Sequence, residues 1–492
     1  MRLLHLNKSA LFLLIFPLVA FADESNINDY YLEIKKTRED VNPDVSRYVY
    51  DKIMKRQSPS HINHNGELQF GLHGMETPAI SVKKDSQKID KAFELLSRAG
   101  VDSLRSSETA WHRVADSTGE PNNFSEVDFQ LQKAKKYNFT HLFVFGYPPA
   151  KYTVANNKLS AVNPKYYTKY KTYLDNTLSH LKGYDVQYAE LGNEVDAPNT
   201  WWMKSSPQMY VNEMKILKEA IQRSGLNIKT VAFSATYSRT EGMGGEKGGR
   251  NFVNKSFELG IDNYTDAYSI HHFVFGADDL PNYMRSEMES FGVKNKPILD
   301  TEQLDTSAAG KGMSNPYDLV KLFARAFFVY DMKRMDYFLA QDRFLNGKLY
   351  SSGLFDADWN PKLRLLAYAM AVDAIKGKQL LYISEPGKDI EAYILESPGN
   401  DVSKYTILLW KNFRKNEKVT ATEVRGLSGS GVIEHWNLDA EKYDSSNRKL
   451  MIDDRPIAIY TNKLPDWKPV DKKVLSSTDT FGIRSYAPMP TD

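Results

Sequence analysis

Residues 186–194 read Val-Gln-Tyr-Ala-Glu-Leu-Gly-Asn-Glu, a short β-favouring run that ends in two adjacent polar side chains, Asn193 and Glu194. Valine and tyrosine favour strands, whereas the glycine directly before Asn193 favours a turn. A similar run, residues 297–303, places Glu302 near its end. Both stretches therefore predict buried strands that carry an acid at their carboxyl ends.

Runs of this kind recur about every 30 to 45 residues along the central part of the chain, and most are separated by stretches with apolar residues at helical spacing. The predicted strands are residues 68–73, 101–107, 140–146, 186–193, 230–236, 267–273, 297–303 and 336–342. The predicted helices are residues 89–99, 127–136, 166–181, 209–224, 317–332 and 362–376. Eight strand–helix alternations predict an α/β fold of the (β/α)₈ barrel (TIM barrel) type at residues 67–377. An open doubly wound sheet is the alternative, but it would need a Gly-rich phosphate-binding turn after the first strand, and the sequence has none.

Residues 378–465 carry a different pattern. Short alternating strands are separated by turns rich in Gly, Asn, Asp and Ser, and they lie at residues 390–395, 405–410, 418–424 and 456–460. Since no long helix intervenes, this region is predicted to form a C-terminal antiparallel β-sandwich domain, completed by a strand from before the barrel. Residues 466–492 are predicted to be a tail.

The part of the chain before the barrel divides in two. Residues 1–22 combine a basic start, an apolar run of about 12 residues and an Ala-Phe-Ala ending, a combination typical of an export signal peptide. A retained membrane anchor is the alternative, but a membrane span needs about 20 residues. Residues 23–66 are polar, with weak helical patterns at residues 30–36 and 48–55, and are predicted to pack on the main domain.

The composition limits the possible functions. The chain has 492 residues, is 41% hydrophobic and 26% charged, and has a formal net charge of +2. These values predict a folded protein and give no support for binding to nucleic acid or to a charged membrane surface. The absence of cysteine excludes disulfides, iron–sulfur clusters, Cys-ligated zinc and thiol nucleophiles. Together with the signal peptide, it predicts a bacterial periplasmic or secreted protein that does not insert into a membrane.

In (β/α)₈ barrels the chemistry lies at the carboxyl ends of the strands, so the polar residues there form the candidate site. In strand order they are His73, Arg105, Glu108, Trp111, Glu190, Asn193, Glu194, His271, His272, Asp300, Glu302, Gln341 and Asp342. Glu194 and Glu302 belong to strands four and seven, nearly opposite each other. Paired carboxylates suit cleavage of a glycosidic bond, because one protonates the leaving oxygen while the other attacks the anomeric carbon or activates water.

Each of these acids has a simpler interpretation as a surface or salt-bridge residue. Glu194 and Glu302 both follow strongly apolar strands, which favours a place in the site. Glu190 lies four residues before Glu194 on the same strand face and is predicted to be a buried partner of Arg105, and Asp300 has a similar interpretation relative to Glu302. Carboxyl groups about 5 to 5.5 Å apart would indicate a retaining mechanism, and a separation of about 6.5 to 9.5 Å would indicate inversion.

Aromatic residues near the predicted barrel mouth are candidates for stacking on sugar rings, and they are Trp111, Tyr147, Tyr152, Trp201, Trp202 and Phe275. Core packing is the alternative for each, and Trp201 and Trp202 are the best candidates because two adjacent residues of an extended loop cannot both point inward. A metal-dependent hydrolase would show a His-x-His pair on the first strand, whereas only His73 is present there. We therefore predict neither a metal nor a cofactor.

The sequence Asn193-Glu194 after Glu190, together with Thr301-Glu302 on strand seven, resembles the clan A glycoside hydrolases, which are retaining (β/α)₈ enzymes. Further marks of this resemblance are Arg105 followed by Trp111, the strand with His271, and the stretch Gly-Leu-Phe-Asp-Ala-Asp-Trp-Asn-Pro-Lys at residues 353–362. A barrel followed by a β-sandwich looks most like family 39 and its relatives, which include β-xylosidases and bacterial exopolysaccharide endoglycosidases. The resemblance extends from about residue 67 to residue 462.

This resemblance implies a role for each matching residue. Glu194 would be the acid/base and Glu302 the nucleophile, while Asn193 would bind the 2-hydroxyl of the sugar. Arg105 would steady Glu302 as a carboxylate, and His271 would line the same subsite. A cation near Glu302 favours its ionised form, whereas a less compensated, desolvated Glu194 can hold a proton near neutral pH.

The chain departs from the clan pattern at three places, one of which is Gly192, where many relatives carry Trp. The clan usually has a Tyr two residues after the strand-six His, hydrogen-bonded to the nucleophile, and this chain has Phe273, so that His272 or another donor would replace it. On strand eight many relatives have an aromatic platform, where this chain has Gln341 and Asp342. Gln341 and His272 are therefore added to the predicted substrate-binding residues.

We therefore expect a retaining glycoside hydrolase that acts on a polysaccharide or oligosaccharide, with a bacterial exopolysaccharide among the substrates that the resemblance implies. A transglycosylase on the same barrel is one alternative, and it would give products longer than the substrate. A non-catalytic carbohydrate-binding barrel is another, and it would release no reducing ends from any glycan.

Overall fold

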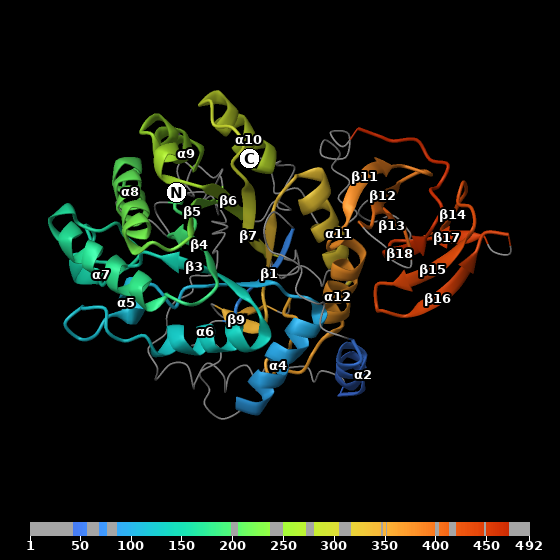
Figure 1. Cartoon of the computed structure of the whole chain (residues 1–492), viewed down its shortest axis with the longest axis horizontal. Coiled ribbons are helices and arrows are strands. Elements are labelled where there is room, and N and C mark those ends of the chain that lie inside the picture. The colour runs from blue at the N-terminus through green and yellow to red at the C-terminus, as the bar shows by residue number, and fades with distance from the viewer. Residues whose placement is uncertain are drawn as a thin grey trace, which may run out of the picture.

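The structure of the protein is a computed structural model (Figure 1). It describes residues 43–56, 68–75, 86–197, 205–236, 249–271, 280–304, 316–345, 348–350, 352–398, 403–412, 420–446 and 449–471. The predicted signal peptide at residues 1–22 lies outside these described residues. Among the described helices, none is both long and apolar enough to cross a bilayer.

Eight parallel strands close into a barrel, which confirms the predicted fold class. The strands are β1 (Gln69–His73), β2 (Ser103–Ser106), β3 (Thr140–Phe145), β4 (Val186–Leu191), β5 (Lys229–Ala235), β6 (Ala267–His271), β7 (Ile298–Leu304) and β8 (Arg334–Phe338). The barrel closes where β1 pairs with β8, with His73 opposite Phe338. Nearly all of the strand residues are buried, because side chains fill the barrel and helices cover it.

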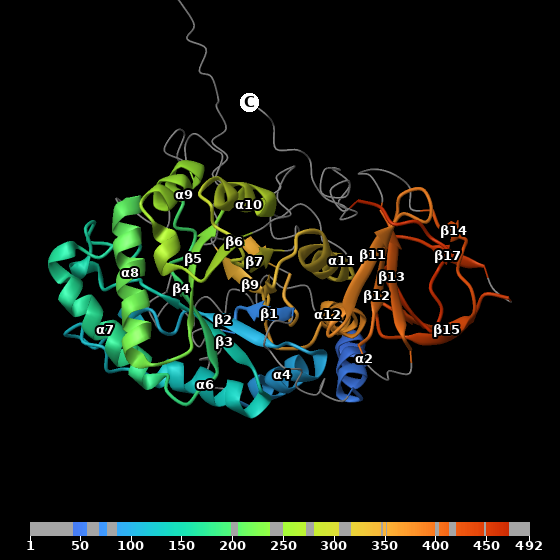
Figure 2. The same cartoon turned by 45° about the horizontal axis from the view of Figure 1, so that its top comes forward.

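Helices surround the barrel in the order expected for this fold (Figures 1 and 2). They are α4 (Ser86–Ala99), α6 (Ser125–Tyr137), α7 (Tyr167–His180), α8 (Pro207–Ser224), α9 (Gly249–Glu258), α10 (Leu280–Ser290), α11 (Asp318–Ala324) and α12 (Leu363–Ile375), with the short α5 (Trp111–Val114) after β2. The helix predicted at residues 317–332 is divided, since α11 continues as the π-helix η7 (Arg325–Val329). Helices α9 and α10 were not predicted from the sequence.

Helix α8 shows how a local sequence signal positions the site. It begins after Ser206, whose hydroxyl accepts a hydrogen bond from the backbone N–H of Met209 at 3.3 Å, and it ends at Ser224, followed by the capping residue Gly225 with a φ of 71°. From its buried face, the Tyr210 hydroxyl donates to the carbonyl of Leu191 at 3.2 Å and accepts from the N–H of Phe233 at 2.8 Å. Tyr210 therefore holds the carboxyl ends of β4 and β5 together.

The C-terminal region forms two antiparallel sheets, as predicted for a β-sandwich. A six-stranded sheet has the order β11-β12-β13-β18-β15-β16, and a two-stranded sheet pairs β14 with β17. The strands are β11 (Gln379–Ser384), β12 (Ile390–Glu396), β13 (Tyr405–Lys411), β14 (Thr422–Val424), β15 (Ser430–His435), β16 (Ala440–Asp444), β17 (Leu450–Ile452) and β18 (Ile457–Thr461). Apolar side chains from both sheets form a separate core. A further pair, β9 (Arg343–Leu345) and β10 (Lys348–Tyr350), follows the last barrel strand.

The prediction that a strand from before the barrel completes the sandwich is wrong for the described part of the chain. All the described strands of both sheets come after the barrel, and residues 43–54 form a helix, α2 (Pro43–Met54). This helix packs on α4 and α12, and its Lys52 forms an ion pair with Asp439 in the turn between β15 and β16. Helix α2 thus connects the barrel with the sandwich (Figure 2).

A buried ion pair joins the barrel to the large sheet. Arg325 lies in the π-helix η7, and its Nε donates to Glu391 Oε1 on β12 at 3.0 Å. Asn412 adds a hydrogen bond to the second carboxylate oxygen at 2.8 Å, and both charged side chains are almost fully buried. Burial alone would raise the pKa of Glu391, but the charge and hydrogen bonds of Arg325 outweigh it and lower this pKa.

We expect Arg325→Met to destabilise the protein by roughly 3 to 5 kcal/mol, because Glu391 would remain as a buried charge without its partner. Chemical denaturation followed by circular dichroism measures this loss. The matched control is Arg223→Met, which removes a half-exposed pair with Asp175 and should cost less than about 1 kcal/mol. An equal loss of unfolding free energy in the two variants would show that the buried pair of Arg325 and Glu391 stabilises the protein no more than a surface pair does.

Candidate active site

The predicted site residues meet at the carboxyl ends of the barrel strands. His73 is the last residue of β1, Arg105 lies near the end of β2, and His271 is the last residue of β6. Glu302 lies on β7, and Glu194 follows β4 by three residues. These five side chains are buried, with 0 to 5% of their surface exposed. The barrel therefore brings together these five of the residues that the strand-end argument selected, whereas Asp342 pairs with Lys362 and Glu108 lies 3.8 Å from Arg113.

Arg105 organises the floor of this site. Its Nε donates to Glu190 Oε2 at 2.7 Å, and its Nη2 donates to Asn193 Oδ1 at 2.7 Å. Its Nη1 lies 3.3 Å from Glu302 Oε2. One planar guanidinium thus contacts β4, the turn that follows β4, and β7, as its fixed fork of donors allows.

Glu190 is a structural anion. Besides the guanidinium of Arg105, it accepts hydrogen bonds from the hydroxyl of Ser269 at 2.6 Å and of Thr301 at 2.8 Å. Burial opposes its ionisation, but Arg105, His271 and the two hydroxyls outweigh this effect and lower its pKa. With its oxygens occupied in this way, Glu190 fits the predicted role of a buried partner of Arg105.

Glu194 stands on an unusual turn. Its φ is 50°, in the left-handed region, and the glycine two residues earlier also has a positive φ, of 74°. The next residue, Val195, donates its N–H to the carbonyl of Phe233 at 3.2 Å, and Asp196 accepts from the N–H of Thr236 at 3.0 Å. These bonds to the end of β5 hold a strained residue in place, a feature often found at functional sites.

Glu302 is surrounded on several sides. Besides Arg105, the Nδ1 of His73 lies 3.3 Å from Glu302 Oε2, and the carboxyl group of Asp300 accepts the backbone N–H of Glu302 at 3.3 Å. Burial raises the pKa of Asp300 well above its usual range, which favours the uncharged form of this acid. Asp300 therefore supports the backbone of Glu302 as a buried residue.

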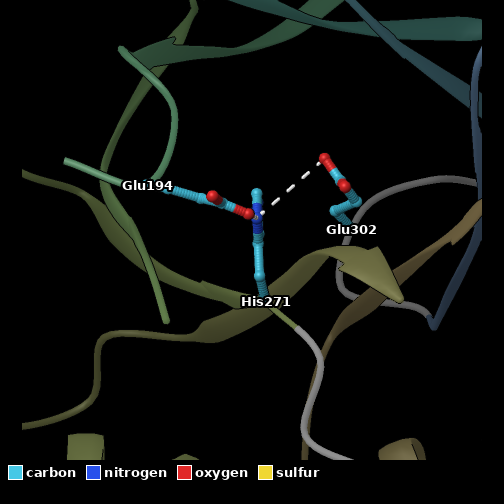
Figure 3. Close-up of side chains that lie close together, drawn as sticks. All are labelled: Glu194, His271 and Glu302. Carbon is cyan, nitrogen blue, oxygen red and sulfur yellow. Dashed lines mark hydrogen bonds and ion pairs between the residues drawn. The ribbon is translucent and has the colours of Figure 1, made fainter. Parts of the chain in front are cut away.

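His271 lies between the two candidate acids (Figure 3). Its Nδ1 is 3.2 Å from Glu194 Oε1 and 4.0 Å from Glu302 Oε2, and its Nε2 is 3.1 Å from the hydroxyl of Thr301. One oxygen of Glu194 and one of Glu302 lie within 4.8 Å of each other. The site therefore contains two close carboxyl groups with an imidazole between them.

These three side chains are also near enough to one another to serve as metal ligands. However, Arg105 places a fixed positive charge 3.3 Å from Glu302, and this charge would repel a divalent cation at that carboxylate. The charge of Glu302 is thus balanced by the guanidinium of Arg105, and this arrangement does not suit a bound metal ion.

Irregular pairing of β7 explains why two adjacent residues, Thr301 and Glu302, both reach the site. The register of β7 shifts against β6 next to His271, and it shifts against β8 between Asp300 and Gln303. In a regular strand adjacent side chains point to opposite faces, whereas a bulge redirects one of them. Sequence reasoning missed the hydrogen bonds of Ser269 and Thr301 to Glu190, and it missed the contact of His73 with Glu302. The position of His73 at the end of the first strand was the available signal.

Trp111 and Tyr152, which were candidates for sugar stacking with core packing as the alternative, pack in the core. Trp111 is 1% exposed, its ring stacks with those of Tyr152 and Tyr173, and its indole N–H donates to the carbonyl of Gly119 at 3.2 Å. Stacking on a sugar requires an exposed ring face, and this cluster has none at Trp111. These aromatic residues form part of the core that supports the loops after β2 and β3.

Tyr147 and Gln341 occupy different surroundings. Tyr147 is 8% exposed, and burial raises its pKa, as do the nearby Glu194 and Glu302, so its hydroxyl is protonated within electrostatic reach of the site. Gln341 donates its side-chain amide to the carbonyl of Ala357 at 2.7 Å, which holds the loop after the last barrel strand. The remaining candidates lie outside the described residues, namely Trp201, Trp202, His272, Phe273 and Phe275.

Comparison with known proteins places the chain by its fold. No protein-family model matches it, and no curated protein matches its sequence. The structure is similar to that of a family 39 glycoside hydrolase from the gut symbiont Bacteroides cellulosilyticus WH2, with a TM-score of 0.62 and 16% identity over 82% of this chain and 83% of that chain. It is also similar to a family 39 β-xylosidase from Caulobacter crescentus, with a TM-score of 0.55 and 12% identity over 83% of this chain and 98% of the other.

A family 30 endoxylanase from Clostridium papyrosolvens C71 is a further neighbour, with a TM-score of 0.54 and 15% identity over 81% of this chain and 97% of that one. These matches agree with the resemblance to clan A that the strand-end residues implied. The chain thus shares its fold with glycoside hydrolases of families 39 and 30.

Proposed function

We propose that this protein is a retaining glycoside hydrolase that cleaves glycosidic bonds of a polysaccharide or oligosaccharide by double displacement. The observation that carries the proposal is the buried carboxyl pair, in which an oxygen of Glu194 lies within 4.8 Å of an oxygen of Glu302. This spacing suits direct attack by one carboxylate. Inverting enzymes need about 6.5 to 9.5 Å between carboxyl groups to admit a water. The fold shared with families 39 and 30 supports the same class.

The two acids have different surroundings, which assigns them different roles. Glu302 contacts the guanidinium of Arg105 and attacks the anomeric carbon as a carboxylate. Glu194 contacts the imidazole of His271 and gives its proton to the leaving oxygen. In the second step Glu194 removes a proton from water, and the hydroxide formed displaces Glu302 from the anomeric carbon. Neither step requires a cofactor.

For the substrate, we propose a β-linked glycan, and a bacterial exopolysaccharide in particular. The structural neighbours are described as a β-xylosidase and an endoxylanase, which supports β-linked bonds. The export signal predicted at residues 1–22 supports a periplasmic or secreted enzyme that meets a polysaccharide outside the cytoplasm. N-terminal sequencing of the protein from a bacterial host would find Asp23 first if this location is right.

The test is hydrolysis of a panel of 2,4-dinitrophenyl β-D- and α-D-glycosides, of xylan and of purified bacterial exopolysaccharides. We expect at least one β-linked substrate to be cleaved, with the first product seen by proton NMR in the anomeric configuration of the substrate. A first product of inverted configuration would contradict the proposal. Products longer than the substrate would favour a transglycosylase, and binding without any new reducing ends would favour a carbohydrate-binding barrel.

A further inference from the structure

We propose that Glu190 and Thr301 fix His271 as the tautomer protonated on Nε2, so that the Nδ1 lone pair faces Glu194 and keeps a proton on that carboxyl group. Thr301 and His271 would then be positioning residues that keep the catalytic proton on Glu194 in the resting enzyme. The consequence for catalysis rests on the proposed function, since it assumes that Glu194 is the general acid. The hydrogen-bond assignment itself depends only on the geometry of the site.

The argument begins at Glu190, which is an ionised carboxylate. It forms a fully buried ion pair with Arg105, with 2.7 Å between Nε and Oε2. Its other oxygen, Oε1, lies 2.6 Å from the hydroxyl of Ser269 and 2.8 Å from the hydroxyl of Thr301. An ionised carboxylate only accepts hydrogen bonds, so both hydroxyls must donate to it.

The next step is at Thr301. A threonine hydroxyl has a single hydrogen, and Glu190 receives it. The oxygen of Thr301 can therefore only accept at its contact with His271 Nε2, where the distance is 3.1 Å. A hydrogen bond there requires a proton on Nε2, which selects this tautomer of His271.

The third step is the charge of His271. The imidazole is completely buried, and burial lowers its pKa. The nearby Glu194 and Glu302 oppose this effect, and Arg105 adds to it, but the net direction is downward. A neutral imidazole has one protonated nitrogen, and because that nitrogen is Nε2, Nδ1 carries a lone pair.

This lone pair meets Glu194. Nδ1 lies 3.2 Å from Glu194 Oε1, which is within the range of a hydrogen bond. If Glu194 were ionised, two acceptors would face each other in a buried place, and the contact would be repulsive. With a proton on Oε1, the same contact becomes a hydrogen bond from Glu194 to His271, so the arrangement favours the acid form of Glu194.

Other charged groups face this pair from the neighbouring strands. Glu302 on β7 lies 4.0 Å from Nδ1 and would favour a proton there, whereas Arg105 on β2 opposes it. Glu190 lies beneath on β4, and Tyr147 follows β3 with a protonated hydroxyl. Glu302 and Arg105 thus act in opposite directions on a proton at His271, whereas the hydrogen bond to Thr301 acts directly at Nε2 and favours the tautomer protonated there.

The proton balance in the reaction follows directly. The proton leaves Glu194 for the glycosidic oxygen once that oxygen replaces Nδ1 as its acceptor. The resulting carboxylate faces the Nδ1 lone pair, and this repulsion makes it a stronger base toward the water of the second step. The proton of that water returns to Glu194, so the resting state is restored without a change in charge at His271.

The test compares Thr301→Val, which removes the hydroxyl at nearly constant volume, with Thr301→Ser, which keeps it. The measurement is a pH titration of the infrared carbonyl band of protonated carboxyl groups in the substrate-free enzyme. The part of the band that disappears in Glu194→Gln belongs to Glu194. In Thr301→Val the tautomer protonated on Nδ1 can form and donate to ionised Glu194. We therefore expect the titration midpoint of Glu194 to fall by roughly half to one pH unit, and Thr301→Ser to match the wild type.

An unchanged midpoint in Thr301→Val, or an equal shift in Thr301→Ser, would overturn the proposal. Thermal unfolding identifies a variant that fails to fold. In that case the tautomer of His271 is determined by NMR on the unmodified protein. With ¹⁵N-labelled histidine, NMR should show His271 with a protonated Nε2 and an unprotonated Nδ1, and the reverse pattern would refute the assignment. Neither readout uses a substrate, so a failure of the proposed hydrolase activity would leave this test intact.

Discussion

Glu302→Gln is expected to reduce turnover of a cleaved glycan by roughly 10⁴- to 10⁶-fold, the range seen when a nucleophile is removed from a catalytic unit. The amide has nearly the volume of the carboxylate, but it cannot form a stable ester with the anomeric carbon. It also removes the negative charge that faces Arg105 at 3.3 Å and His73 at 3.3 Å. The measurement is kcat on the best substrate of the glycoside panel.

The fold should survive this change, because Arg105 keeps its ion pair with Glu190. Thermal unfolding checks this point. Asp300→Asn serves as a control on the same strand, since burial raises the pKa of Asp300 and favours its uncharged form, and an amide oxygen can still accept the N–H of Glu302. The loss of kcat in Asp300→Asn should be far smaller than the loss in Glu302→Gln. Undiminished hydrolysis by Glu302→Gln would show that Glu302 is not the nucleophile.

Glu194→Ala is expected to slow hydrolysis of an unactivated glycan by roughly 10²- to 10⁴-fold, the usual contribution of a general acid. The effect on glycosyl-enzyme formation should be much smaller with a 2,4-dinitrophenyl glycoside, because that leaving group departs without protonation. Comparing kcat/KM for the two kinds of substrate measures this difference directly. A uniform loss on both would contradict the role of Glu194 as acid.

Azide provides the matched test of the second step. In Glu194→Ala the glycosyl-enzyme lacks a base to activate water, and a small anion such as azide can occupy the vacated space and attack without one. We expect azide to restore turnover of the dinitrophenyl glycoside and to give a glycosyl azide of retained configuration. An azide product of inverted configuration would instead place the alanine at the nucleophile position.

The barrel could be predicted from sequence because its strands are short, apolar and spaced by amphipathic segments, and each of these signals is local. The pair Glu194 and Glu302 could be selected because barrels place their chemistry at strand ends. Arg105 followed from the same rule. These arguments use only the order of residues along single strands and the known closure of the fold.

Contacts made across the fold could not be predicted in this way. Trp111 lies just after β2, where a sugar-binding aromatic is plausible, but the chain returns some forty residues later and stacks Tyr152 on its ring. Thr301 should point away from the site if β7 alternated regularly, and only the shift of its register brings the hydroxyl to Glu190. Both outcomes depend on long-range packing, which local pattern does not encode.

The segment before the barrel is a further case in which contacts across the fold could not be predicted from the local sequence. Residues 48–55 carry a weak helical pattern, whereas the β-sandwich was predicted to include a strand from before the barrel. In the structure the six-stranded sheet is made from later strands alone, and α2 instead joins α12 to the turn at Asp439. Helix α2 packs on α4 and α12, and such contacts between distant segments are not visible in the local sequence pattern.

The most direct test of the double-displacement mechanism is to trap its covalent intermediate. The enzyme is incubated with the 2,4-dinitrophenyl 2-deoxy-2-fluoro derivative of the sugar that it cleaves, and the protein is then digested and analysed by mass spectrometry. We predict one fluoroglycosyl group per protein, attached to the peptide that contains Glu302. An adduct on any other residue, or no adduct in an enzyme that releases an inverted product, would contradict the assignment of Glu302 as the nucleophile of a retaining hydrolase.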